Sequence, residues 1–140
     1  MKKDFLICID GTMEQEDFSD HIQLKTRGGF VFKDGNFFIT YEESETTGYA
    51  GCTTTVKIAQ DSSRVAMLRY GPAASQLIIE KGIRHVCHYE TGTGSLNLGV
   101  AADEISCELT PTGGTAQFSY TLDSGTQEIS RNLVTITVSQ

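Results

Sequence analysis

The chain has 140 residues, of which 39% are hydrophobic and 21% charged, and its formal net charge is −7. This composition is typical of a globular fold and excludes an intrinsically disordered chain. The acidic charge argues against nucleic acid or an anionic membrane as a partner, because such binding depends on clustered lysine and arginine. No basic cluster offsets this charge, since Arg64, Arg69, Lys81, Arg84 and Arg131 are scattered singly.

The first residues, Met1-Lys2-Lys3, precede a short apolar stretch from Phe5 to Ile9. Asp10 ends that stretch too early for a signal peptide, and no small-residue cleavage site follows it. No apolar run in the sequence approaches the ~20 residues of a membrane-spanning helix. We therefore expect a first β-strand here.

Apolar and polar residues alternate with a period of two in several segments, which is typical of strands with one buried face. The alternating apolar sets are Phe5, Ile7 and Ile9; Leu96, Leu98 and Val100; Ile105, Cys107 and Leu109; Ala116, Phe118, Tyr120 and Leu122; and Val134, Ile136 and Val138. The repetition of one pattern along the chain predicts an all-β fold.

Turn-forming residues separate these segments at intervals of roughly 8–12 residues. The expected turns are Asp34-Gly35-Asn36, Gln60–Ser63, Gly71-Pro72, Lys81-Gly82, Thr91–Gly94, Ala102-Asp103, Gly113-Gly114 and Asp123–Gly125. Gly28-Gly29 lies in an extended stretch and predicts a bulge or corner. We expect one domain over residues 1–140, an antiparallel meander of about 8–10 strands. Closure into a barrel would remove exposed edges, but the pattern also allows a sandwich.

An ordered set of motifs extends this interpretation. It consists of Gly29–Glu43, Gly48, Thr53–Ile58, Leu68–Gly71, Tyr89-Glu90-Thr91, Gly94 and Tyr120-Thr121-Leu122. In this order they resemble the YwiB-like family of bacterial proteins of unknown function. The resemblance implies a calycin-like barrel of the lipocalin and fatty-acid-binding-protein type, in a cytoplasmic bacterial protein. It implies no activity, substrate or catalytic residue.

Barrels of this size are either filled by their own side chains or hold one small ligand, so inward polar residues are the candidates for a site. By parity, Tyr41 and Glu43 share a face with Phe37 and Ile39, and Arg69 shares one with Val65 and Met67. An inward arginine can bind a carboxylate or phosphate in a bidentate pair.

Tyrosine hydroxyls from Tyr41, Tyr89 and Tyr120 are candidate donors to the same ligand. The alternative is a structural ion pair between Glu43 and Arg69 that closes one mouth of the barrel, with the tyrosine hydroxyls reaching solvent.

The sequence predicts neither a metal site nor a cofactor. His85 and Cys87 would share one face of a strand while His88 points to the other, and His21 is the only further histidine. A stable zinc site needs three or four ligands. The four cysteines, Cys8, Cys52, Cys87 and Cys107, form no Cys-x-x-Cys pair and are expected to be buried, reduced thiols.

An enzyme is not expected. There is no Gly-x-Ser-x-Gly elbow, and Glu42 and Glu43 face opposite sides of a strand, so they cannot act as a carboxylate pair. The favoured function is a barrel that binds a small, partly apolar ligand with an anionic group. The alternative is a filled barrel that acts as a protein-interaction module or a homodimer.

Overall fold

The computed structural model describes residues 2–90 and 94–140. They form ten strands and one short 3₁₀ helix, η1. The elements are β1 (Lys2–Gln15), β2 (Phe18–Lys33), β3 (Asn36–Glu42), η1 (Glu45–Thr47), β4 (Thr53–Ala59), β5 (Arg64–Tyr70), β6 (Ser75–Glu80), β7 (His85–Glu90), β8 (Ser95–Thr110), β9 (Gly113–Asp123) and β10 (Glu128–Ser139).

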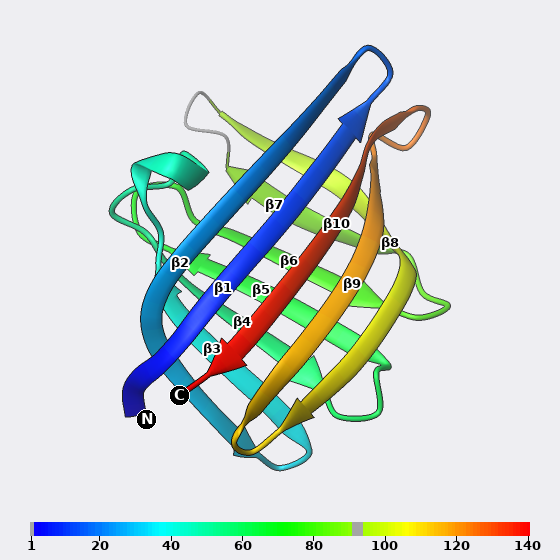
Figure 1. The fold of residues 1–140 in the computed structure, drawn as a ribbon. Helices are drawn as coiled ribbons and strands as arrows, with labels where there is room; N and C mark the ends of the chain where they lie inside the picture. The colour runs from blue at the N-terminus through cyan, green and yellow to red at the C-terminus, as the bar shows by residue number, and fades with distance from the viewer. Residues whose placement is uncertain (1, 91–93) are drawn as a thin grey trace.

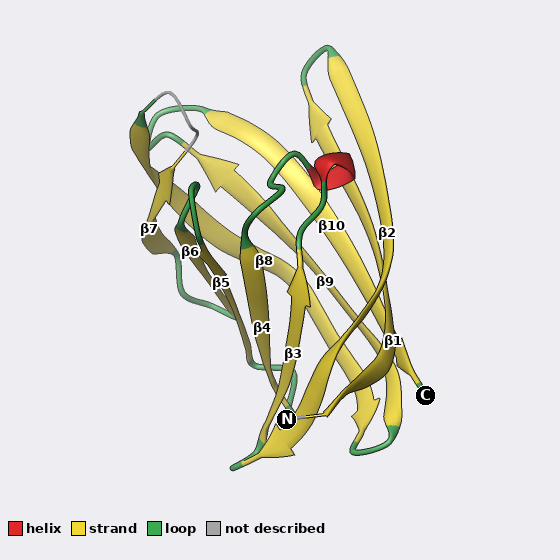
Figure 2. Cartoon of the chain, turned by 90° about the vertical axis from the view of Figure 1, so that its left-hand side faces the viewer, coloured by secondary structure: helices red, strands yellow, loops and turns green. Residues whose placement is uncertain are grey.

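The strands form a closed antiparallel barrel in which each strand pairs with its neighbours in sequence, and β1 pairs with β10 (Figure 1). The closing ladder runs from the pair Leu6–Ser139 to the pair Glu14–Arg131. The predicted all-β meander barrel is therefore confirmed, and the sandwich is excluded. In the side view, the strands curve around an interior, and η1 lies at the upper end (Figure 2).

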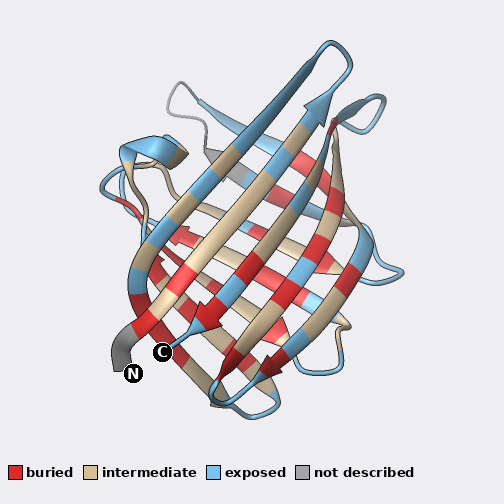
Figure 3. Cartoon of the chain, viewed as in Figure 1, coloured by how far each residue is buried: buried red, intermediate tan, exposed pale blue. Residues whose placement is uncertain are grey.

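One end of the barrel is filled by aromatic side chains. The ring of Phe30 lies 5.2 Å from that of Phe5, edge to face, and 5.8 Å from that of Phe37, stacked. Ile7, Ile39 and Val56 belong to the same core and are completely buried. The tip of the β1–β2 hairpin is exposed (Figure 3). The inward positions predicted from parity in β1, β9 and β10 are confirmed by this core.

Most predicted turns are present, and Asp34-Gly35 adopts the positive φ values, 52° and 80°, of a tight hairpin turn. Two predictions were wrong. Ala102-Asp103 is not a turn, since β8 continues through it with a register shift between Ala102 and Glu104. The prediction failed because a bulge inverts the side-chain alternation along a strand, just as a turn between two strands would. Gly113-Gly114 opens β9, and the turn lies at Pro111-Thr112.

The predicted Thr91–Gly94 turn falls largely outside the described residues. Among the residues described, no helix is long and apolar enough to cross a membrane. The cytoplasmic location stays a prediction.

All four cysteines are free thiols, as expected, but only Cys52 and Cys87 are buried. Cys8 is half-buried because its neighbours Ile7 and Ile9 take the inward positions of β1. Cys107 is half-buried as well.

Gly28 marks the corner at which the continuous β1–β2 register ends, and pairing of β2 with β3 begins at the next residue, Gly29. The register of β1 against β2 shifts next to it, between Lys2 and Phe5. A Cβ atom at residue 28 would overlap the carbonyl oxygen of Thr40 and the side chain of Ile7. The corner expected from Gly28-Gly29 is thus a site of close backbone approach.

We predict that Gly28→Ala lowers the free energy of unfolding by about 1–3 kcal/mol, because the added methyl group overpacks this corner. Urea denaturation measures the change. Gly11→Ala is the matched control, since its Cβ would meet nothing closer than the Leu133 carbonyl oxygen at 4.0 Å. Equal stability of the two variants would contradict the prediction.

Candidate functional site

A cavity of about 230 Å³ lies inside the barrel, and Thr47 of η1 is among the residues that line it. Its two walls differ in character. Strands β1, β2, β9 and β10 contribute mainly apolar side chains, namely Ile9, Met13, Ile22, Leu122, Val134 and Ile136. Strands β3 to β6 and the η1 loop contribute most of the polar ones, namely Tyr41, Glu43, Thr47, Tyr49, Thr54, Arg69 and Ser75.

The polar wall is built on a row of four residues that follow one another across four strands. Tyr41 pairs with Thr54, Thr54 with Arg69, and Arg69 with Ser75. Directly paired residues of neighbouring strands point to the same face. The sheet register therefore places all four side chains in the interior, at spacings of about 4.8 Å.

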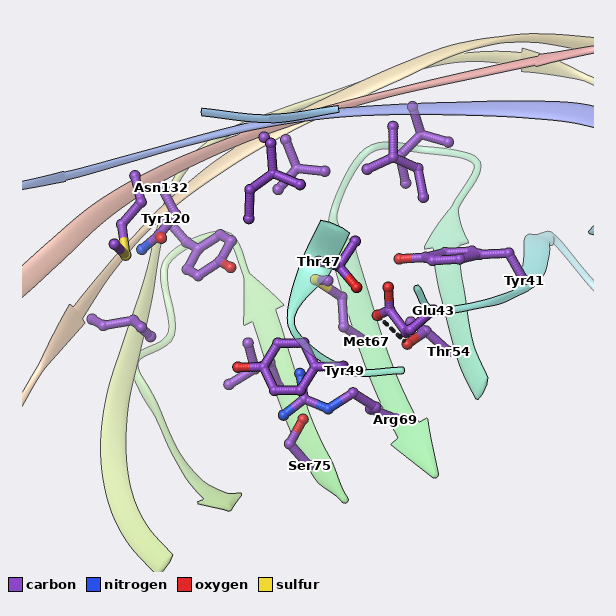
Figure 4. Close-up of a pocket in the computed structure, with 18 residues that line it drawn as sticks. Tyr41, Glu43, Thr47, Tyr49, Thr54, Met67, Arg69, Ser75, Tyr120 and Asn132 are labelled. Carbon is purple, nitrogen blue, oxygen red and sulfur yellow. Dashed lines mark hydrogen bonds between the residues drawn. The ribbon is translucent and has the colours of Figure 1, made fainter. Parts of the chain in front are cut away.

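Arg69 is held from two sides. Its Nε donates a hydrogen bond of 2.6 Å to the carbonyl oxygen of Ala73, and its guanidinium carbon lies 3.5 Å from the centre of the Tyr49 ring. The face of an aromatic ring attracts a cation that lies over it, so Tyr49 stabilises the guanidinium group in this position. Arg69 is only 9% exposed. Its charge is therefore fixed in position on the cavity wall (Figure 4).

The position of Tyr49 over Arg69 depends on η1, whose two ends are both capped. Ser44 caps the helix by accepting a hydrogen bond from the backbone nitrogen of Thr46, and Gly48 ends it with a φ of 85°. The same loop is tied to β3 by a hydrogen bond of 2.9 Å from the nitrogen of Glu43 to the oxygen of Cys52. The loop thereby contributes Thr47 and Tyr49 to the lining of the cavity.

Glu43 lies beyond the end of β3, on the same wall. Its Oε2 accepts a hydrogen bond of 2.7 Å from Oγ1 of Thr54, and the Thr54 side chain is buried (Figure 4). The contact of Glu43 with Thr54 thus lies beside the contacts of Arg69 with Ala73 and Tyr49 on one wall.

Tyr41 is buried beside this pair of charges. Burial raises the pKa of its hydroxyl well above the ordinary value, and the nearby carboxylate of Glu43 raises this pKa further. Tyr41 is therefore a neutral hydrogen-bonding group at physiological pH. Tyr120, which is also buried, comes from β9 on the opposite wall.

Four of the five residues predicted from the sequence, Arg69, Glu43, Tyr41 and Tyr120, line this one cavity. The side chain of the fifth, Tyr89, lies outside the described residues.

Sequence reasoning missed Thr54, Ser75 and Tyr49. The parity rule that found Arg69 could have found Thr54, because Thr54 alternates with the buried Val56 and Ile58. No local pattern predicts the placement of Tyr49, which depends on the η1 loop.

Two of the three histidines, His21 and His85, lie outside the cavity, each beside one carboxylate. Nε2 of His85 is 2.9 Å from Oε1 of Glu80, and Nε2 of His21 is 2.7 Å from Oδ1 of Asp10. Within residues 2–90 and 94–140, no three His, Cys, Asp or Glu side chains gather as metal ligands would.

We predict that Tyr41 makes the protein less stable as the pH rises above about 10, the ordinary pKa of tyrosine. Since the pKa of Tyr41 is raised in the folded state, the unfolded chain loses this proton first, and deprotonation then favours unfolding. Urea denaturation at increasing alkaline pH should give a shallower loss of stability for Tyr41→Phe than for the wild type. Parallel profiles would refute the prediction.

Comparisons with known proteins agree with this architecture. Residues 7–136 match the model of a domain of unknown function, DUF1934. The crystal structure of the ywiB protein from Bacillus subtilis superposes with a TM-score of 0.81 at 19% sequence identity, covering 96% of this chain and 89% of that one. No curated protein matches the sequence. The likeness to the Bacillus structure shows the fold, and the chain belongs to the DUF1934 family, the YwiB-like proteins of unknown function.

Proposed function

We propose that this protein binds a small, partly apolar molecule with an anionic group inside the barrel. The observation that carries the proposal is the cavity, whose wall of aliphatic side chains faces a wall bearing a buried arginine. Ligand sites are mostly apolar with a few fixed polar groups that set orientation. The cavity has this composition.

The space at this end of the barrel is large enough for a small organic molecule. The cavity measures about 230 Å³, and an adjoining hollow of about 340 Å³ shares lining residues with it, Tyr49 and Tyr120 among them. Sites for drug-sized molecules measure roughly 300–1,000 Å³. A single-ring acid is therefore a suitable first probe.

The electrostatics favour a small anion over a polyanion. The surface is acidic, with a net charge of −7, but exposed charges are screened beyond about 8–10 Å at physiological salt. Arg69 is buried, so its attraction at close range is screened far less. A small molecule can enter and reach this charge, whereas a nucleic acid would meet only the acidic exterior.

The filled-barrel alternative fits only one half of the interior. Aromatic side chains fill the end around Phe30 and Phe37, while the end around Arg69 holds the cavity. Filling of the interior therefore offers no support for an interaction module.

We expect Arg69→Gln to weaken binding of 3-phenylpropionate, a small apolar anion, by about 10- to 100-fold. A hydrogen bond to a charged group contributes roughly 1.5–3 kcal/mol, and each 1.4 kcal/mol is tenfold in affinity. Titration followed by NMR measures the dissociation constants.

Arg64→Gln is the control, because Arg64 lies on the same strand but is exposed, beside Glu80. Equal affinities of the two variants would contradict the proposed role of Arg69. Absence of any 3-phenylpropionate binding to the wild type would contradict the proposed anion site.

A further inference from the structure

The cavity holds two fixed charges of opposite sign, Arg69 and Glu43 (Figure 4). We propose that the ligand is a small zwitterion with an apolar body, whose anionic group lies at Arg69 and whose cationic group lies at Glu43. This inference rests on the proposed binding function and specifies its ligand class.

The spacing of the two charges suits one small molecule. Glu43 follows β3 and Arg69 lies in β5, with β4 and its Thr54 between them. Two strand spacings, about 10 Å, separate Arg69 from Tyr41, and Glu43 lies two residues beyond Tyr41. The side chains of Glu43 and Arg69 line the same cavity. A ligand with two nearby charges can therefore contact both groups at once.

The hydrogen bond from Thr54 prepares Glu43 for such a role. It fixes the carboxylate on the cavity wall through Oε2. An ionised carboxylate only accepts hydrogen bonds and has about four lone-pair sites, so one hydroxyl donor leaves acceptor capacity for an ammonium group. The fixed geometry lowers the ordering cost of binding.

The charge balance discriminates between ligand classes. A simple anion gains from Arg69 but is repelled by Glu43, and a simple cation meets the reverse situation. A zwitterion gains from both charges, because each of its charged groups lies beside a protein charge of opposite sign. It also carries no net charge, so the acidic surface does not repel it.

The opposite wall defines the rest of the ligand. Ile22, Val134 and Ile136 face the polar row across the cavity. An apolar side chain of moderate size would lie against them, with its charged groups toward Glu43 and Arg69. Apolar α-amino acids have this combination of groups.

The first experiment compares three probes of one shape on the full-length protein by NMR titration: phenylalanine, 3-phenylpropionate and 2-phenylethylamine. They carry both charges, the negative charge alone and the positive charge alone. We expect phenylalanine to bind at least about tenfold more tightly than either of the others, since the second charge adds a charge-assisted contact. Tighter binding of 3-phenylpropionate overturns the zwitterion but leaves the proposed anion site standing. Binding of none of the three overturns both.

The second experiment uses Glu43→Gln. Removal of the carboxylate should weaken phenylalanine binding about tenfold and strengthen 3-phenylpropionate binding, which reverses their order of affinity. Loss of fold would lower both affinities together and cannot produce this reversal. Glu42→Gln is the matched control, because it makes the same charge change on the exposed face of β3. An unchanged order of affinities in Glu43→Gln overturns the inference even if the wild type binds phenylalanine.

Discussion

The pairing of the first strand with the last is the constraint on which this barrel depends. Without the ladder from Leu6–Ser139 to Glu14–Arg131, β1 and β10 would each present an open edge. The ladder also fixes the apolar wall of the cavity, since Ile9 pairs with Ile136, and Gly11 with Val134. Its partners lie at opposite ends of the sequence, so the chain must pay a large loop-closure entropy before the ladder forms.

The same closure explains what the sequence could predict. Barrel strands bury one face only, so a period of two is a local signal that needs no knowledge of the partners. It was sufficient to place Tyr41, Arg69 and Tyr120 on the inside. It failed at Ala102-Asp103, where a bulge and a turn leave the same local signature. The alternation also does not predict the position of Tyr49, which depends on contacts of the η1 loop.

The polar row illustrates how a barrel accommodates buried polar groups. A charge in the interior is costly unless hydrogen bonds and nearby charges compensate it. Arg69 meets this requirement through Ala73 and Tyr49, and Glu43 through Thr54. These groups lie near strand ends, where loops supply backbone oxygens and aromatic rings. The opposite half of the barrel is filled with phenylalanine instead.

One further feature concerns the contact between β6 and β7. In the described residues, their Cα register includes a single pair, Ser75–Tyr89, whereas β7 and β8 are paired from His85–Val100 to Glu90–Ser95. Part of this gap is bridged by the backbone nitrogen of Ile78, which donates to Sγ of Cys87 at 3.4 Å. Sulfur is a weak acceptor. The barrel therefore has a weakly paired seam between β6 and β7, whose amide protons should exchange with solvent sooner than those of the β1–β10 ladder. Local opening of this seam would widen the interior from the side of the barrel rather than from its end.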